Sequence, residues 1–74
     1  MIESTDFSRL RKGQRVRKYY YSGMTRLYKD GTVEKGLYGD GFAYVRWDNE
    51  NRLDINVSIC DVVLLKPERN EVIK

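Results

Sequence analysis

Hydrophobic residues recur at every second position in several stretches of the chain, the spacing of β-strands with one buried face. Four such runs lie at residues 14–21, 32–38, 42–48 and 52–57, and a short continuous apolar run at 62–65 suits a last strand. In the third run Ala43, Val45 and Trp47 alternate with Phe42, Tyr44 and Arg46. Because an unpaired charge does not fit in a small core, Arg46 predicts that Ala43, Val45 and Trp47 face inward. The fourth run is predicted to turn Leu53, Ile55 and Val57 inward in the same way.

Turn-forming residues separate these runs. Residues 22–30 break the alternation and are predicted to form a long loop that ends at the turn signal Asp30-Gly31. A Gly-Asp-Gly sequence at 39–41 predicts a tight hairpin, and residues 58–61 predict one turn of 3₁₀ helix. The order of elements predicts an all-β fold, a five-stranded SH3-like barrel with a long first loop and a one-turn 3₁₀ connector before the last strand.

The length of 74 residues is sufficient for one domain. We expect a partly ordered N-terminal basic arm at residues 1–12, the barrel at residues 13–66 and a C-terminal tail at residues 67–74. A core of this size supplies a free energy of unfolding of only about 3–5 kcal/mol. Each large buried residue is therefore expected to matter for stability.

The residue types argue against catalysis. The chain has no histidine and a single cysteine, Cys60, so it lacks a disulfide, a Cys/His metal site and the usual general base near neutral pH. Four acids, Asp48, Glu50, Asp54 and Asp61, fit turn and surface positions better than a catalytic pair. Cys60 adjoins Ile59 and is predicted to be a buried packing residue. We therefore expect no enzyme activity, no metal and no cofactor.

The first twelve residues contain only scattered apolar positions, unlike a signal peptide or a membrane span. Together with the free cysteine, this pattern predicts a soluble cytoplasmic protein that has no membrane partner.

The charges are unevenly distributed along the chain. Residues 9–29 contain eight of the 14 basic residues and no acid, so the other positions combine six basic residues with all eleven acids, a balance of −5. This asymmetry predicts two faces of opposite sign, of which the basic one would meet a polyanion. The simpler alternative is a highly charged, solvated surface.

A basic and aromatic row follows from the alternation of the first strand. If Val16 points inward, the opposite face presents Arg15, Arg17, Tyr19 and Tyr21, which Lys18, Arg26 and Lys29 could extend. Cations that replace phosphate counterions and flat rings that stack on bases are what nucleic-acid binding requires. The leading prediction is therefore a module that binds DNA or RNA mainly through phosphates. The alternative role of these side chains is as ordinary exposed strand residues.

A second set of aromatic residues lies near the two predicted hairpins, at Tyr28, Tyr38, Phe42 and Tyr44. Small barrels bind peptides in grooves lined by such rings. The alternative function is therefore an adaptor, subunit or inhibitor that docks an acidic partner protein through the basic face and through Tyr28, Tyr38, Tyr44 and Arg46. An enzyme assembled as an oligomer, with its site at the pore, is a third alternative that no residue pattern favours.

The stretch from 13 to 65 also resembles several SH3-like families. Gly-Gln-Arg-Val-Arg at 13–17, Gly-Thr-Val at 31–33 and Val-Arg-Trp-Asp at 45–48 resemble the small SH3-like protein of photosystem I. Val-Arg-Trp-Asp-Asn at 45–49 is similar to Tudor and mind-bomb-type repeats, and the basic first strand resembles the DNA-binding C-terminal domains of retroviral integrases. These resemblances imply the barrel fold much more than any one function.

Overall fold

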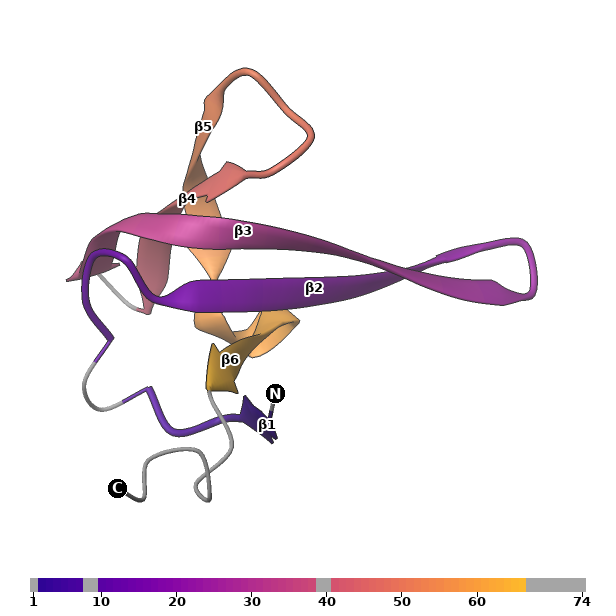
Figure 1. The fold of residues 1–74 in the computed structure, drawn as a ribbon, viewed down its shortest axis with the longest axis horizontal. Helices are drawn as coiled ribbons and strands as arrows, with labels where there is room; N and C mark the ends of the chain where they lie inside the picture. The colour runs from indigo at the N-terminus through magenta and orange to yellow at the C-terminus, as the bar shows by residue number, and fades with distance from the viewer. Residues whose placement is uncertain (1, 8–9, 39–40, 67–74) are drawn as a thin grey trace, which may run out of the picture.

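The computed structural model describes residues 2–7, 10–38 and 41–66, and these residues form six β-strands and one short 3₁₀ helix. The elements are β1 Ile2–Ser4, β2 Arg15–Ser22, β3 Thr25–Tyr38, β4 Phe42–Trp47, β5 Leu53–Ser58, η1 Ile59–Asp61 and β6 Val62–Lys66 (Figure 1). The predicted all-β class is confirmed, and so is the single 3₁₀ turn before the last strand. Ser58 caps this turn, because its hydroxyl accepts a hydrogen bond from the Cys60 backbone N–H.

All six strands belong to one antiparallel sheet with the order β1-β6-β2-β3-β4-β5. The prediction of five strands missed β1, which pairs with the last strand, β6, over three residues. Among the described residues, no pairing joins the two outer strands β1 and β5. The sheet is therefore open, and backbone hydrogen bonds do not close it into the predicted barrel.

The predicted long first loop is wrong, because most of residues 22–30 continue the two strands. β2 and β3 form one hairpin whose register runs without a break from Arg15↔Thr32 to Ser22↔Thr25. Only Gly23 and Met24 form the turn, and Gly23 adopts a φ of 63°, which glycine reaches without steric cost. The hairpin extends well beyond the rest of the sheet (Figure 1).

Gly31 lies inside β3, where the sequence predicted a turn. It pairs with Val16 on one side and with Trp47 on the other. A Cβ atom here would stand 2.8 Å from the Arg46 carbonyl oxygen, from Trp47 Cε3 and from Val45 Cγ1. The glycine is therefore required by a close approach of strands rather than by a turn.

The core lies on one face of the sheet and is built mainly of β-branched residues around one tryptophan. It contains Val16, Val33, Val45, Trp47, Val57, Val62 and Leu64. Phe7 and Leu10, from the segment before β2, pack against it. The N-terminal segment predicted as a basic arm thus contributes a strand and two core contacts. The inward orientation predicted for Val16, Ala43, Val45 and Trp47 is confirmed.

The orientation predicted for Ile55 is wrong: 54% of this side chain is exposed. The cause is a register shift, because Ala43 pairs with Val57 whereas Val45 pairs with Asp54. Across this interval β5 contains one residue more than β4, and one inserted residue moves the side chains that follow it to the opposite face of the sheet. Asp54 consequently reaches the core side and accepts a hydrogen bond of 3.3 Å from the Trp47 indole N–H.

Candidate binding surface

The outer face of the β2–β3 hairpin carries the side chains on which the nucleic-acid prediction depends. β2 contributes Arg15, Arg17, Tyr19 and Tyr21, and β3 places Thr32, Asp30, Tyr28 and Arg26 directly opposite them. Val16 is buried on the other face, so the predicted outward direction of the arginines holds. The partners opposite the arginines, however, come from a register that the sequence did not reveal.

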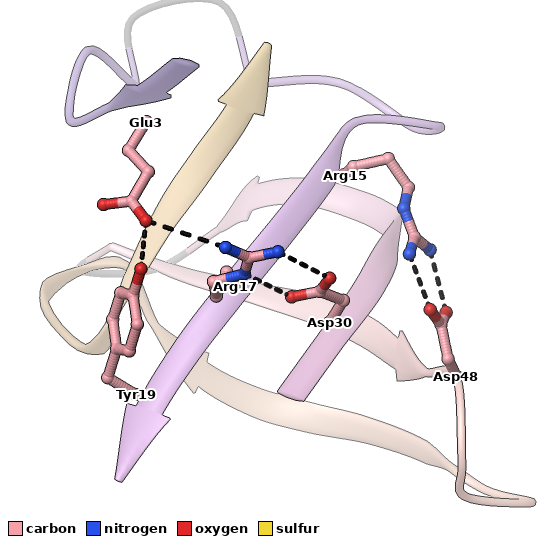
Figure 2. A network of polar contacts seen from close by, with 6 residues as sticks. All are labelled: Glu3, Arg15, Arg17, Tyr19, Asp30 and Asp48. Atoms are coloured by element: carbon pink, nitrogen blue, oxygen red, sulfur yellow. Dashed lines mark hydrogen bonds and ion pairs between the residues drawn. The ribbon is translucent and has the colours of Figure 1, made fainter. Parts of the chain in front are cut away.

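Arg15 forms a bidentate ion pair with Asp48, which directly follows β4 (Figure 2). Its Nη1 and Nη2 donate to the two carboxylate oxygens at 2.8 and 2.6 Å, and Nη1 also donates to the Thr32 hydroxyl at 2.8 Å. The hydrogen bond with Asp48 raises the pKa of Arg15, and the same bond lowers the pKa of Asp48. Both donors on the outer edge of this guanidinium are therefore occupied within the chain.

Arg17 is held by one acid from β3 and one from β1 (Figure 2). Its Nε and Nη2 donate to the Asp30 carboxylate at 2.7 and 3.1 Å, and its Nη1 lies 3.8 Å from a Glu3 oxygen. The hydrogen bond to Asp30 is the largest cause of the raised pKa of Arg17. Glu3 also accepts a hydrogen bond from the Tyr19 hydroxyl, so the short strand β1 is tied to β2 by side chains as well as through β6.

These contacts cancel the charge of the outer face. Three positive side chains and three negative ones are gathered there, namely Arg15, Arg17 and Arg26 against Glu3, Asp30 and Asp48. A phosphate that approached Arg15 or Arg17 would compete with a carboxylate already in place. Among the basic residues at 9–29, Arg15, Arg17 and Lys29 thus have acidic partners in the folded chain.

Cations and rings alternate along the outer part of this face. The Tyr19 and Tyr28 rings meet edge to face, with centroids 6.2 Å apart and an interplanar angle of 69°. The Arg17 guanidinium lies 4.0 Å from the Tyr28 ring centroid, and that of Arg26 lies 4.0 Å from the Tyr19 ring centroid. These contacts fix the side chains where the hairpin leaves the body of the sheet.

The outer part of the hairpin, residues 19–28, is called the hairpin arm below. β6 pairs with β2 only from Arg15 to Lys18, and β4 pairs with β3 only from Gly31 onward. The arm strands therefore pair only with each other among the described residues. The exposed large apolar or aromatic side chains of the arm are Tyr20, Tyr21, Met24, Leu27 and Tyr28.

Lys18 and Lys29 face each other at the base of the arm, on the same side as Val16. Lys29 Nζ lies 2.9 Å from a Glu50 oxygen and 4.7 Å from the Trp47 ring centroid. No acid pairs with Lys18 among the described residues. A shallow cleft of about 330 Å³ is lined by Lys18, Tyr20, Lys29 and Glu50.

Two of the residues predicted for protein docking lie far from each other. Tyr28 belongs to the arm, whereas Tyr44 is on β4 with the Lys35 ammonium 5.3 Å from its ring centroid. Tyr44 pairs with Lys35, seven residues from Tyr28 along β3, or about 23 Å of strand. Arg46 forms an ion pair of 3.1 Å with Glu34. The side chain of Tyr38 lies outside the described residues.

Sequence reasoning missed Met24 and Leu27 as surface candidates because it assigned 22–30 to a loop, and it missed Tyr20 because this residue alternates in step with the inward-facing Val16. The signal was present in the alternation of Thr25, Leu27 and Lys29 with Arg26 and Tyr28, which continues the strand spacing. Cys60 was predicted to be buried and is exposed in η1.

Within the described parts of the chain, no three His, Cys, Asp or Glu side chains are grouped so that they could hold a metal ion. The same residues form no helix that is long and apolar enough to cross a membrane. Comparisons with models of protein families, with curated proteins and with solved structures give no match. The resemblances to three SH3-like families therefore stay predictions, and function has to be argued from the surface itself.

Proposed function

We propose that this protein is a non-catalytic binding module that docks a partner protein through the hairpin arm. The observation that carries the proposal is the arm itself, a two-stranded projection without a core of its own (Figure 1). The Met24 side chain at its tip is fully exposed, and Tyr21 and Tyr28 are 69% and 55% exposed. An isolated two-stranded hairpin is marginally stable in water, so such an arm gains order when a partner covers it.

The residue types of the arm are those that protein interfaces favour. Tyrosine, methionine and arginine are enriched at interface centres, and tyrosine buries a large area with little loss of side-chain entropy. The arm contains four tyrosines, one methionine and one arginine within ten residues, and no acid. Exposed apolar clusters of this kind in small proteins mark interaction sites more often than chance.

Nucleic-acid binding is the competing function, and the ion pairs weigh against it. Binding through phosphates gains its free energy by releasing counterions, and an arginine that already has a carboxylate partner releases few. Arg15, Arg17 and Lys29, three of the seven residues predicted for this role, have such partners. Arg26 and the exposed rings remain suited to stacking on bases, so the test below includes this outcome.

The finer structural class is part of the same proposal. Without β1, the strand order β6-β2-β3-β4-β5 and the 3₁₀ turn before β6 support an open SH3-like barrel. The absence of histidine from the chain supports a role without acid-base catalysis. A cytoplasmic location is proposed because Cys60 is a free, exposed thiol, which a reducing compartment preserves.

The test is an affinity capture of host-cell proteins on the immobilised chain, at about 250 mM salt, with and without nuclease. A variant with Tyr21, Met24 and Tyr28 changed to serine removes the three most exposed large side chains of the arm. Leu37→Ser is the matched control, because Leu37 is an exposed leucine on the same strand, outside the arm.

We expect a captured protein whose binding persists in salt and after nuclease treatment. This binding should be lost with the triple variant and retained with Leu37→Ser. Capture that persists with the triple variant would contradict docking through the arm. Retention that disappears after nuclease treatment would instead support the nucleic-acid function.

A further inference from the structure

Both edges of the hairpin arm lack a strand partner within the described part of the chain, and they differ in how well they are protected. Natural edge strands avoid unwanted pairing by carrying charges, prolines or bulges. The β3 edge of the arm carries one cation, Arg26, and Lys29 lies at its base. The β2 edge, residues 19–22, reads Tyr-Tyr-Tyr-Ser and has no charge, proline or glycine. The β2 edge is therefore the one on which a further strand can form hydrogen bonds.

A strand added at this edge would continue the line of β6. β6 occupies the same side of β2 and ends its pairing where Val62 meets Lys18. Beyond Lys18 the backbone N–H and C=O groups on that side of β2 have no strand partner within the described residues. A strand that pairs with 19–22 would extend the sheet past the end of β6.

The charges beside this edge select the chemistry of the occupant. Residues 18–29 contain three cations and no acid, and the Glu3 carboxylate reaches this edge at the Tyr19 hydroxyl. Lys29 is neutralised by Glu50, and Arg26 stacks on Tyr19, but Lys18 has no acidic partner among the described residues. Lys18 opens into the cleft that it shares with Tyr20 and Glu50, directly beside the free edge.

We propose that the docked segment of the partner is an extended, acidic strand that pairs with residues 19–22 of β2 and places a carboxylate against Lys18. This proposal rests on the protein-docking function and names the chemistry of the partner. Backbone pairing supplies affinity along the edge, and the carboxylate at Lys18 supplies selectivity.

A second copy of this chain fits the edge less well. Pairing of two β2 edges would bring together two segments 18–29, each with three cations and no acid, so no charge on either segment would complement the other. A heterologous acidic strand removes this repulsion and gives Lys18 an acidic partner.

The experiment selects binders to the full chain from a random library of peptides about twelve residues long, in place of the unknown partner. The best binders are then measured by titration against the unmodified chain and against Lys18→Glu. Lys12→Glu is the control, because Lys12 is an exposed cation outside the arm and its replacement changes the net charge equally.

We expect the selected peptides to be enriched in Asp and Glu, and Lys18→Glu to weaken their binding about tenfold while Lys12→Glu changes it less than about twofold. Single N-methylation of the peptide backbone should abolish binding at every second position. This period of two is the signature of an added strand, in which alternate amides face the neighbouring strand.

Three results would overturn the proposal. The selected peptides could lack an excess of acids, N-methylation could have no period of two, or the library could yield no binder. A concentration-dependent dimer that loses its stability with the triple arm variant would assign the edge to a second copy. Peptides that bind the arm but show no period of two on N-methylation would contradict the added strand and leave protein docking through the arm intact. Peptides whose affinity does not change in the triple arm variant would contradict docking through the arm as well.

Discussion

Replacement of Gly31 by alanine tests the close approach of β3 to β4, which sets where the hairpin leaves the sheet. The added methyl group would stand 2.8 Å from a backbone oxygen of Arg46 and from two core atoms, Trp47 Cε3 and Val45 Cγ1. Ordinary contacts begin at 3.4 Å, so each of these three atoms would have to yield by 0.6 Å. Because Trp47 and Val45 are almost completely buried, neither has free space to move into.

The size of the effect follows from this geometry. One extra methyl group in a well-packed core costs about 1–3 kcal/mol. The whole domain has a free energy of unfolding of only about 3–5 kcal/mol at this length. With a urea dependence of about 1 kcal/mol per molar, the midpoint of Gly31→Ala should fall by about 1–3 M.

Urea unfolding followed by tryptophan fluorescence is a direct assay, because Trp47 is the single tryptophan and is 2% exposed. The sign of the change in the urea midpoint shows whether Gly31 packs closely against Trp47. At an unstrained position with free space, Gly→Ala stabilises a protein by about 0.4–1 kcal/mol, through a less flexible unfolded chain. A midpoint equal to or above that of the unmodified protein would refute the pairing of Gly31 with Trp47 and the register of the hairpin that depends on it.

Three further predictions concern stability and exposure. Leu64→Ala should leave the domain largely unfolded by circular dichroism, because the loss of about 2–5 kcal/mol approaches the total, whereas Leu37→Ala at an exposed site should unfold like the original chain. Folding lowers the pKa of Asp48 below the value of about 3.9 in the unfolded chain, so its pair with Arg15 stabilises the fold above about pH 4 and loses this effect as the pH falls further. Asp48→Asn should therefore be less stable than the original chain at pH 7. The difference in free energy of unfolding should be under about 1 kcal/mol, since the Arg15 and Asp48 side chains are partly exposed. Urea midpoints of the two chains that still differ near about pH 2 would contradict this account. Cys60 should react with a thiol reagent in the native protein as fast as in urea, and protection in the native state would contradict its exposure.

The spacing of apolar residues was enough to assign most of the strands and most of the core, but not β1 or the outer part of the β2–β3 hairpin. Burial on one face of a strand imposes a period of two, so Val16, Val45 and Trp47 could be assigned to the interior from their spacing alone. Ser58 and the residues after it indicated the 3₁₀ turn for an equally local reason, the capping hydrogen bond within three residues.

The register between strands was decided only by the tertiary structure. One extra residue in β5 reversed the side to which Ile55 points, and no local signal marks where such a shift occurs. The same holds for the candidate surface: Arg17 meets Asp30 across the hairpin, and Arg15 meets Asp48 thirty-three positions away. The excess of positive charge at 9–29 is a property of the chain, but the ion pairs of Arg15, Arg17 and Lys29 require partners that only the fold brings within hydrogen-bonding distance, because charge interacts through space rather than along the sequence.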